Sequence, residues 1–404
     1  MTETSSFEHA EPKGLSDGSK SHDTPGLKRR EFLAIGALPL AAAVGPVNLV
    51  CPRGASVKRS QQEPIRIGMI GAGTNLRTVQ IPAFRRIPGC EIVAVANRSL
   101  ESSQRVTDEF NIPRAYANWE QLLDDDGIDA VSIGTWPYMH RTLTLAALER
   151  GKHVLTQARM ANNAQEARDM LEASLQHPDL VCQLVPTSMS YRIDNVLKRM
   201  IGEGYLGDVL SVELQRLQTR FPAVGGELDW RHDERFSGYN ILNIGASYEA
   251  MMRWLGRGNR VMAMSKLHVP YRSNAAGEPT SVVIPDHVDV LFELANGAQV
   301  HMRASETTGL STGNETWIHG SEGTIYVDRR QNVFAGRRGD SELTEVPNPR
   351  SEQAYNRVEE EFTNAIRGVE EITMAPFETG VRYMEWTEAV YRSSQTGQTA
   401  YLPV

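Results

Sequence analysis

Strand-like runs alternate with amphipathic segments along the first half of the chain. Runs of five or six residues, the length of buried strands, lie at 65–70, 91–96, 128–133, 152–156 and 180–185. Segments with helical spacing of apolar residues lie between them, at 76–86, 116–123, 139–150 and 163–176. Strands alternating with helices of this length predict an α/β fold with a doubly wound parallel sheet over residues 64–186.

The second half of the chain, residues 187–404, follows a different pattern. Two pairs of strand-like runs surround short glycine turns, 288–294 and 298–304 around Asn296-Gly297, and 317–319 and 324–328 around Ser321-Glu322-Gly323. Such turns predict hairpins, and therefore an α+β domain with a large, mostly antiparallel open sheet. Helical patterns at 352–367 and 378–394 predict helices that return after the strands. We expect one face of the sheet to join copies of the chain into a homo-oligomer.

The first 63 residues have the features of a signal peptide and linker. A polar stretch ends in Lys28-Arg29-Arg30, and an Ala-rich apolar run to Val50 follows, interrupted by prolines and a glycine. This run is short for a membrane span, whereas the basic start and Ala41-Ala42-Ala43 fit a cleaved signal. The paired arginines resemble a twin-arginine signal. We therefore expect a periplasmic or otherwise exported protein with no stable membrane span after signal removal. An uncleaved basic anchor remains the alternative.

Composition narrows the class of partner. The 404 residues carry a formal net charge of −8 at pH 7. The sequence shows no basic stripe of the kind that nucleic-acid binders carry, which argues against a nucleic-acid partner. The three cysteines, Cys51, Cys90 and Cys182, form no CxxC motif or Cys/His cluster, so the sequence predicts no metal site.

A glycine turn follows the first predicted strand directly. Strand, glycine turn, helix and strand succeed one another in the order that a dinucleotide-binding βαβ unit requires, although the third glycine position of the pattern is Leu76. The turn would let main-chain N–H groups approach a diphosphate at the helix N-terminus. The residues expected to form this cradle are Gly71, Ala72, Gly73, Thr74 and Asn75.

The ends of the next strands supply further candidates. Asn97, Arg98 and Ser99 follow the second strand, where a carboxylate would select NAD over NADP. The absence of a carboxylate there favours NADP, because Arg98 could pair with its additional phosphate, and NAD is the alternative. Arg98 could also be simply a solvated loop residue. The loops after two later strands should reach the same edge of the sheet. They contribute Thr135, Trp136, Pro137, His140, Gln157, Ala158 and Arg159.

The order of these motifs resembles the glucose–fructose oxidoreductase/inositol dehydrogenase (Gfo/Idh/MocA) family. The resemblance rests on Thr135-x-Pro137-x-x-His140, Gly151-Lys152-His153-Val154-Leu155, Tyr191-Arg192, Gly204-x-x-Gly207-Asp208-Val209 and the closing Leu402-Pro403. It implies an N-terminal Rossmann domain, a C-terminal domain with an open antiparallel sheet, and hydride exchange between a nicotinamide and a carbohydrate or polyol hydroxyl. The expected partner is thus a small carbohydrate.

The chain departs from that family where the resemblance places the catalytic groups. The family's Glu-Lys-Pro is Gln157-Ala158-Arg159 here, and its Asp-x-Gly-x-His runs from Asn243 to Ser247. Neither Ala158 nor Asn243 exchanges a proton near neutrality, and serine is a poor base without a partner. Other residues must supply the acid or base, and we consider His232, Tyr239, Tyr248 and Glu249.

Each of these residues also has a structural interpretation. His232 lies in a stretch that a solvated loop would also explain, Glu249 could pair with Arg253 at i+4, and His140 is expected to position the nicotinamide loop rather than titrate. Asn240, Asn243 and Ser247 share one helix face, which the resemblance places in the substrate cleft. Substrate contacts are further expected from Tyr191, Arg192 and Trp230.

Three functions remain open at the level of sequence. The first is an NAD(P)-dependent oxidoreductase acting on a sugar or sugar derivative. The second is an NAD-dependent glycoside hydrolase or lyase, in which the cofactor oxidises the sugar transiently. The third is a non-catalytic dinucleotide- or sugar-binding protein, motivated by the three altered positions Ala158, Asn243 and Ser247.

Overall fold

The computed structural model describes residues 63–239 and 241–403. The predicted signal peptide and linker, together with Asn240, lie outside the described residues. Within the described ranges, no helix has both the length and the apolar character needed to cross a membrane.

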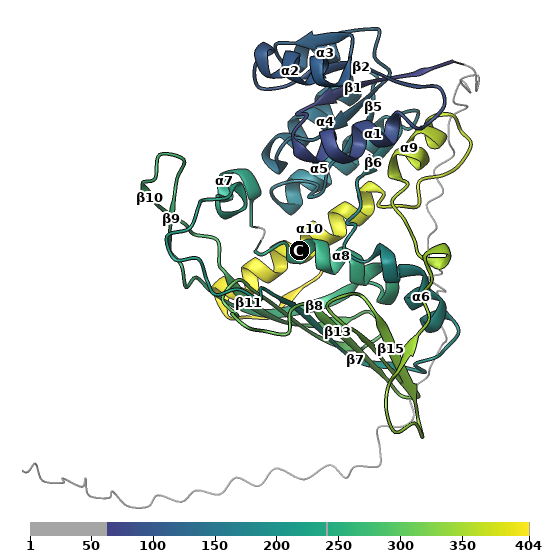
Figure 1. Cartoon of the computed structure of the whole chain (residues 1–404), viewed down its shortest axis with the longest axis vertical. Coiled ribbons are helices and arrows are strands. Elements are labelled where there is room, and N and C mark those ends of the chain that lie inside the picture. The colour runs from purple at the N-terminus through teal and green to yellow at the C-terminus, as the bar shows by residue number, and fades with distance from the viewer. Residues whose placement is uncertain (1–62, 240, 404) are drawn as a thin grey trace, which may run out of the picture. The chain divides into compact units, whose positions relative to one another are not determined.

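The first sheet is parallel and doubly wound, as predicted (Figure 1). Its strand order is β3-β2-β1-β4-β5-β6, so the chain moves outward from β1 in both directions. Strands such as β4 are buried along their whole length, because helices cover both faces of a sheet of this kind. The strands are β1 Ile65–Ile70, β2 Cys90–Ala96, β3 Arg114–Tyr116, β4 Ala130–Ile133, β5 His153–Thr156 and β6 Cys182–Leu184.

The helices of this region differ from the prediction in three places, and one of them is α2, Leu100–Phe110, which was not predicted. The helix expected from residue 116 begins only at Trp119, because Tyr116 still pairs with Ala96 in the sheet and Asn118 caps the helix. The helix over 76–86 is a π-helical turn followed by one α-helical turn. The elements are η1 Leu76–Gln80, α1 Ile81–Phe84, α2 Leu100–Phe110, α3 Trp119–Leu123, η2 Pro137–Met139, α4 His140–Glu149 and α5 Ala164–Gln176.

The second sheet has nine strands in the order β16-β15-β14-β13-β7-β12-β11-β8-β17. Only the pairing of β7 with β12 is parallel, and both predicted hairpins are confirmed. The strands are β7 Val209–Leu217, β8 Gly258–Lys266, β11 His287–Leu294, β12 Gln299–Ser305, β13 Glu315–Gly320, β14 Gly323–Val327, β15 Val333–Arg337, β16 Thr344–Val346 and β17 Ala400–Tyr401. β9 Tyr271–Ser273 and β10 Pro279–Ser281 form a separate pair.

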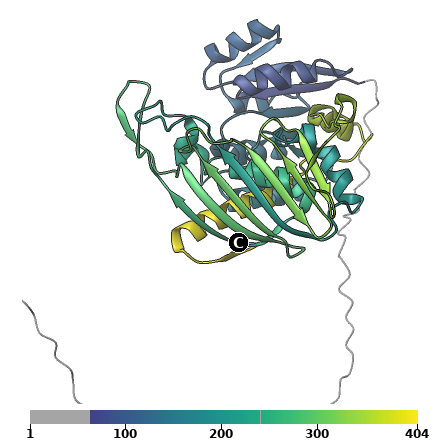
Figure 2. The same cartoon turned by 60° about the horizontal axis from the view of Figure 1, so that its bottom comes forward.

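Three helices, α6 Tyr191–Gly202, α8 Ile244–Leu255 and α10 Phe377–Thr396, lie on one side of this sheet. Figure 2 shows the strands crossing in front of them, with the opposite face uncovered. The buried Trp386 on α10 stacks on Tyr248 of α8 at 4.3 Å and meets Phe292 of β11 edge-on at 5.3 Å. This aromatic contact holds α8, and therefore the residues at its start, in a fixed position above the sheet.

The helix α9, Val358–Ile366, returns from the second half of the chain to the first sheet. Val358 and Phe362 are fully buried in one core with Ile81 and Phe84. The helix predicted over 352–367 begins six residues late, since only a short 3₁₀ turn, η4 Arg350–Glu352, forms before it. The core of the first sheet therefore contains residues from both halves of the sequence.

Candidate functional site

The glycine loop after β1 has the geometry of a dinucleotide cradle. Gly71 has a φ of +74°, and a Cβ there would lie 2.5 Å from Thr135 Cγ2. Next to Gly73, by contrast, the space is open, since a Cβ would meet only the Gly71 carbonyl at 3.9 Å. The N–H groups of Thr74 and Asn75 stand at an exposed helix start, where no intrahelical acceptor exists. These residues fit a diphosphate.

The segment after β2 explains which side chains remain available to the cofactor. Asn97 Oδ1 accepts a 2.7 Å hydrogen bond from the N–H of Ala72, and its Nδ2 donates to the carbonyl of Ser102. Ser99 caps α2 by accepting from the N–H of Ser102. Asn97 is therefore engaged within the protein, whereas the exposed Ser99 hydroxyl only accepts and can still donate to a ligand. Arg98 is exposed and, within the described residues, has no hydrogen bond or ion pair.

His140 joins the loops that follow β4 and β5. Its ring is fully buried, with Nε2 2.9 Å from the Thr135 carbonyl and Nδ1 2.8 Å from the Arg159 carbonyl. Burial lowers the pKa of His140, and the neighbouring carbonyls only partly oppose this shift. The residue thus fixes the two loops in place and does not face solvent. Pro137 is buried beside it, while Trp136 stays 40% exposed at the rim.

Arg159 connects the first sheet to the second half of the chain. Arg159 is only 4% exposed. Its Nη1 lies 3.4 Å from Asn243 Oδ1, and its Nη2 donates to the Ser237 carbonyl at 3.2 Å. The guanidinium also lies 5.7 Å from the ring centre of Trp230. Burial lowers the pKa of Arg159 to about 9, so the group remains a cation at neutral pH. Of its neighbours, Gln157 bonds Asn75 across the loop, and Ala158 is exposed.

An aromatic cluster covers this junction. Trp136 stacks on Trp230 at 5.9 Å and contacts Phe236 at 4.7 Å. Trp230 and Phe236 belong to two short elements, η3 Trp230–His232 and α7 Glu234–Ser237. The next residue, Gly238, has a φ of +58°, and a Cβ there would lie 2.0 Å from the Asn162 carbonyl. Only glycine allows this close approach.

The start of α8 forms the floor of the site. The helix begins at Ile244, later than predicted, because Leu242 and Asn243 both adopt the left-handed conformation, with φ of 50° and 62°. Asn243 thereby turns toward Arg159, and Ser247, only 2% exposed, accepts a 3.2 Å hydrogen bond from Arg216 Nε. The two positions that hold an acid and a base in the family are therefore each in contact with an arginine.

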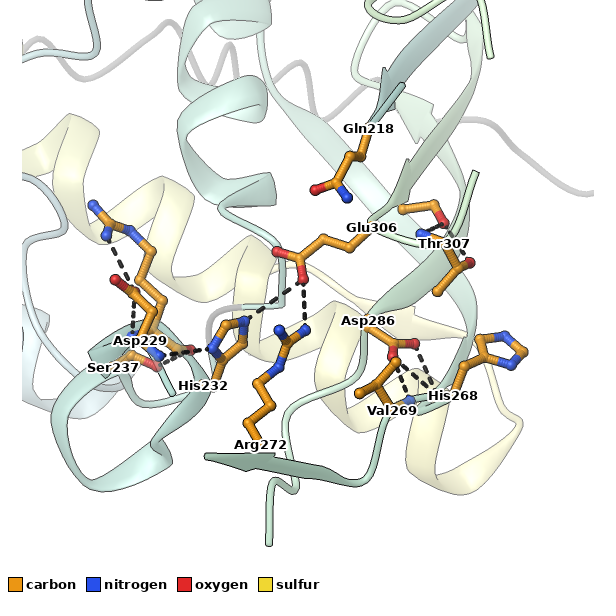
Figure 3. A network of polar contacts seen from close by, with 12 residues as sticks. Gln218, Asp229, His232, Ser237, His268, Val269, Arg272, Asp286, Glu306 and Thr307 are labelled. Carbon is orange, nitrogen blue, oxygen red and sulfur yellow. Dashed lines mark hydrogen bonds and ion pairs between the residues drawn. The ribbon is translucent and has the colours of Figure 1, made fainter. Parts of the chain in front are cut away.

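A polar network lies beside this floor (Figure 3). His232 Nε2 is 3.6 Å from Glu306 Oε2, and the same carboxylate oxygen accepts from Arg272 Nη2 at 3.0 Å. The N–H of Asp229 donates to His232 Nδ1 at 3.2 Å. The contact with His232 is the largest cause of the lowered pKa of Glu306. His232 and Glu306 thus form a pair in which an imidazole lies beside a carboxylate whose lowered pKa keeps it ionised.

Several predicted residues do not reach this site. Tyr248 is in the core, with its hydroxyl accepting from the Gly258 N–H, and Glu249 is 3% exposed and paired with Arg253 at 2.6 Å. The prediction that Tyr248 or Glu249 serves as the acid or base is therefore wrong, and both residues are structural. For Glu249, the ion pair with Arg253 is the alternative that the sequence indicated. Tyr191 is buried under Arg253, and Arg192 bonds the Arg330 carbonyl on the surface. Tyr239 is 38% exposed and stacks on Tyr391 at 4.1 Å.

Sequence reasoning missed Arg216, Arg272 and Glu306. Arg216 had a detectable signal, since Val212, Leu214 and Arg216 alternate on β7 and the first two are fully buried. A charged residue at such a position is unusual and is often functional. Arg272 and Glu306 had no such signal, because they come together from segments more than thirty residues apart.

Comparisons with known proteins agree with this geometry. Residues 65–183 match the family model described as "Oxidoreductase family, NAD-binding Rossmann fold", and residues 195–326 match "GFO/IDH/MocA C-terminal domain". Among relatives, levoglucosan dehydrogenase of Pseudarthrobacter phenanthrenivorans is 25% identical over 68% of this chain and 78% of its own length. The 1,5-anhydro-D-fructose reductase of Ensifer adhaerens is 27% identical over 83% of this chain and 98% of its own length.

A third relative and a solved structure complete the comparison. The "D-xylose 1-dehydrogenase (NADP(+)) 2" of Haloferax volcanii is 26% identical over 83% of this chain and 99% of its own length. The structure of levoglucosan dehydrogenase in complex with NADH and levoglucosan superposes with a TM-score of 0.72 at 21% identity. It covers 85% of this chain and 100% of that chain, and at this identity the likeness shows the fold alone.

Proposed function

Because the chain belongs to the Gfo/Idh/MocA family of oxidoreductases, we propose that it transfers hydride between NAD(P) and a hydroxyl or carbonyl group of a sugar or sugar derivative. One observation carries this proposal. At Arg159, the loop after β5 meets the start of α8, so the cofactor edge of the first sheet opens onto polar groups of the second half of the chain. Relatives named as sugar dehydrogenases and reductases agree with such a substrate.

Different residues of the chain would bind the cofactor and stabilise the reacting substrate. The loop from Gly71 to Asn75 would hold the diphosphate, and the rim after β4, at Trp136, would border the nicotinamide. The bound dinucleotide supplies the site that accepts or gives up hydride. Arg159 holds Asn243 beside the reacting carbon and, as a cation, stabilises the oxyanion that develops on the substrate oxygen.

We assign the proton transfer to His232. Its Nδ1 would take the proton of the substrate hydroxyl and give up the 3.2 Å hydrogen bond that it accepts from the Asp229 N–H, while the ionised Glu306 beside Nε2 stabilises the resulting imidazolium. We expect His232→Asn to lower kcat by about 100-fold or more, measured as nicotinamide absorbance at saturating dinucleotide. The loss should be partly recovered at high pH, where solvent hydroxide replaces the base.

A matched control is available in the same region. His268 is also bonded to a neighbouring carboxylate, but through its backbone N–H to Asp286, and its imidazole points away from Glu306 (Figure 3). His268→Asn should leave kcat within about twofold. Equal activity of the two variants would remove His232 from the mechanism.

We also propose that the chain prefers NADP over NAD. Arg98 is the one cation at the end of β2, is exposed, and stands one residue before the N-terminus of α2, which favours a phosphate. We expect Arg98→Asp to weaken NADPH binding by about 30-fold or more and to leave NADH binding within about threefold, measured by titration calorimetry. Equal loss for both dinucleotides would contradict the preference. Arg105→Asp, further along α2, is the control.

Turnover assays decide among the three functions considered from the sequence. The purified chain is incubated with each dinucleotide and a panel of sugars and glycosides. A net change in reduced nicotinamide absorbance supports the oxidoreductase. Release of the aglycone without net change would replace it with the hydrolase or lyase, and sugar binding without either would leave a non-catalytic protein.

Export is proposed from the sequence alone. Arg29-Arg30 and the apolar run behind them support a twin-arginine route, which accepts folded proteins. Fractionation of cells that express the full chain should place a shortened product in the periplasm. Full-length protein confined to the cytoplasm would reject the proposal.

We further propose that copies of the chain associate through the open face of the nine-stranded sheet. Met262, Met264 and Leu291 are 47%, 77% and 56% exposed on this face, and Met262 and Leu291 line a hollow of about 400 Å³. Leu291→Lys should shift the sedimentation of the protein toward the monomer, because the loss of apolar contact area and the burial of a charge both oppose association. An unchanged oligomer would exclude this face.

A further inference from the structure

Arg216 places a positive charge on the core side of a strand. Along β7 the residues Val212 and Leu214 are 1% and 0% exposed, and Arg216 is the next residue in the same alternation. Strands in such sheets usually carry apolar side chains at inward positions. Burial lowers the pKa of Arg216 to about 10, with no charged neighbour to oppose the shift.

The contacts of Arg216 are all with neutral groups. Nε–H donates to Ser247 Oγ at 3.2 Å, and Nη1 donates to the Gln215 carbonyl at 2.8 Å. Within the described part of the chain, no carboxylate forms an ion pair with this guanidinium. A guanidinium has five N–H donors, so donors remain for another partner. Arg216 is half-buried, and a cation partly withdrawn from water without a counter-charge is costly, so an anionic ligand would offset that cost.

A cavity of about 480 Å³ adjoins Arg216 at the ends of β7 and β12. Arginines predominate among its charged residues, and neither Arg220 nor Arg329 has an ion pair among the described residues. The single carboxylate in the wall, Glu306, already faces Arg272 at 3.0 Å and His232 at 3.6 Å. The charged and amide residues of the lining are Arg216, Gln218, Arg220, Glu306, Asn314 and Arg329. The cavity therefore has an excess of positive charge.

We propose that this cavity binds the anionic group, a carboxylate or a phosphate, of an acidic sugar, an inference that rests on the proposed function and names its substrate class. Leu242, which lines the cavity, directly precedes Asn243, which contacts Arg159. When Arg216 binds the anionic group, the sugar ring attached to it therefore extends toward Arg159 and His232. Guanidinium groups bind both carboxylates and phosphates in a bidentate manner. A neutral sugar would leave Arg216 without its partner and would be disfavoured for that reason.

The test compares ligands that differ only in the anion. The full chain, saturated with NADPH, is titrated calorimetrically with methyl glycosides, methyl glycosiduronates and methyl glycoside 6-phosphates of the gluco, galacto and manno series. None of these has a free carbonyl, so the reduced cofactor cannot react. In at least one series an acidic ligand should bind about tenfold or more tightly than its neutral counterpart, and the advantage should shrink as salt rises. A larger gain with the uronate identifies a carboxylate, and a larger gain with the phosphate identifies a phosphoryl group.

Two variants test the residues. Arg216→Gln and, as a second variant at the rim of the cavity, Arg329→Gln should each reduce affinity for the acidic ligand by about tenfold or more and change the neutral ligand by less than about threefold. Their NADPH affinity should be unchanged. Arg199→Gln, an exposed arginine of α6 paired with Glu203 at 3.8 Å, is the matched control and should change nothing.

The outcomes separate this inference from the proposed function. If neutral sugars are oxidised or reduced and no acidic ligand in any series binds more tightly than its neutral counterpart, the inference is wrong and the function stands. If acidic ligands bind through Arg216 and no sugar is turned over with either dinucleotide, the anion site stands and the oxidoreductase proposal fails. An acidic preference that survives both substitutions also overturns the inference.

Discussion

Replacing Gly71 with alanine is expected to weaken NADPH binding by about 100-fold or more. Its φ of +74° is strained for any residue with a Cβ, and that atom would lie 2.5 Å from Thr135 Cγ2 and 2.9 Å from Thr135 N. One of these contacts is with backbone, so the glycine loop itself must shift. The shift would displace the Ala72 N–H from Asn97 and the helix start from the diphosphate. Titration calorimetry of the purified variant with NADPH measures the loss.

Gly151 offers a matched control for backbone strain. Its φ of +68° is almost the same, but a Cβ there would meet nothing within 4 Å. Gly151→Ala should lower the melting temperature without changing the affinity for NADPH. Unchanged affinity in Gly71→Ala, or equal losses in both variants, would show that the loop does not hold the dinucleotide as described.

Replacing Glu359 with glutamine is expected to stabilise the protein above neutral pH. Glu359, near the start of α9, is 3% exposed, and its Oε1 has no hydrogen-bond partner in the described structure. Burial raises its pKa to about 7 from an ordinary value of 4.5, and Arg86 only partly opposes the shift. The pKa of Glu359 is higher in the folded chain than in the unfolded chain. The contribution of this carboxyl to the free energy of unfolding is therefore fully present below pH 4.5 and is lost as the pH rises to 7. The ionised group then costs roughly 3 kcal/mol.

Glu359→Gln removes this ionisation. Its free energy of unfolding, measured by urea denaturation, should exceed that of the unaltered protein by about 2–3 kcal/mol at pH 8.5 and by much less at pH 5. The neighbouring Glu360, exposed and paired with Arg357 at 3.3 Å, provides the control. Glu360→Gln should change stability by less than about 1 kcal/mol at both pH values. A gain at Glu359 that does not depend on pH would contradict the ionisation of a buried carboxyl.

The fold was predictable where a repeating pattern in the sequence has a direct structural meaning. Strand β1 was predicted with its observed bounds, because a mostly apolar run of six residues ends at a glycine turn. Both hairpins followed from Asn296-Gly297 and from the turn before Gly323. Helix α2 was not predicted, since its sequence is amphipathic but mostly polar and it begins at a Ser99 cap. The late start of α8 was missed because nothing local indicates the left-handed conformation of Leu242.

The site was predictable in part, for a related reason. The glycine loop and the ends of the parallel strands follow from topology, so their meeting at one edge required no knowledge of side-chain direction. Tyr248 and Glu249 looked reactive by residue type, whereas their positions on α8 point them into the core. Arg272 and Glu306 meet only in the folded chain, and Arg216 reaches Ser247 across the gap between strand and helix. Residue type indicates possible chemistry, but tertiary contacts decide which groups are available for it.

The return of α9 to the first sheet affects how this protein can be made. Val358 and Phe362 complete a core whose other members, such as Ile81 and Phe84, are synthesised almost three hundred residues earlier. Until α9 has been synthesised, the part of this core that Val358 and Phe362 cover stays exposed to water and to chaperones. Truncation after β6 would leave that core permanently unfinished. We therefore expect the first sheet to bind a dinucleotide stably only once α9 has been synthesised.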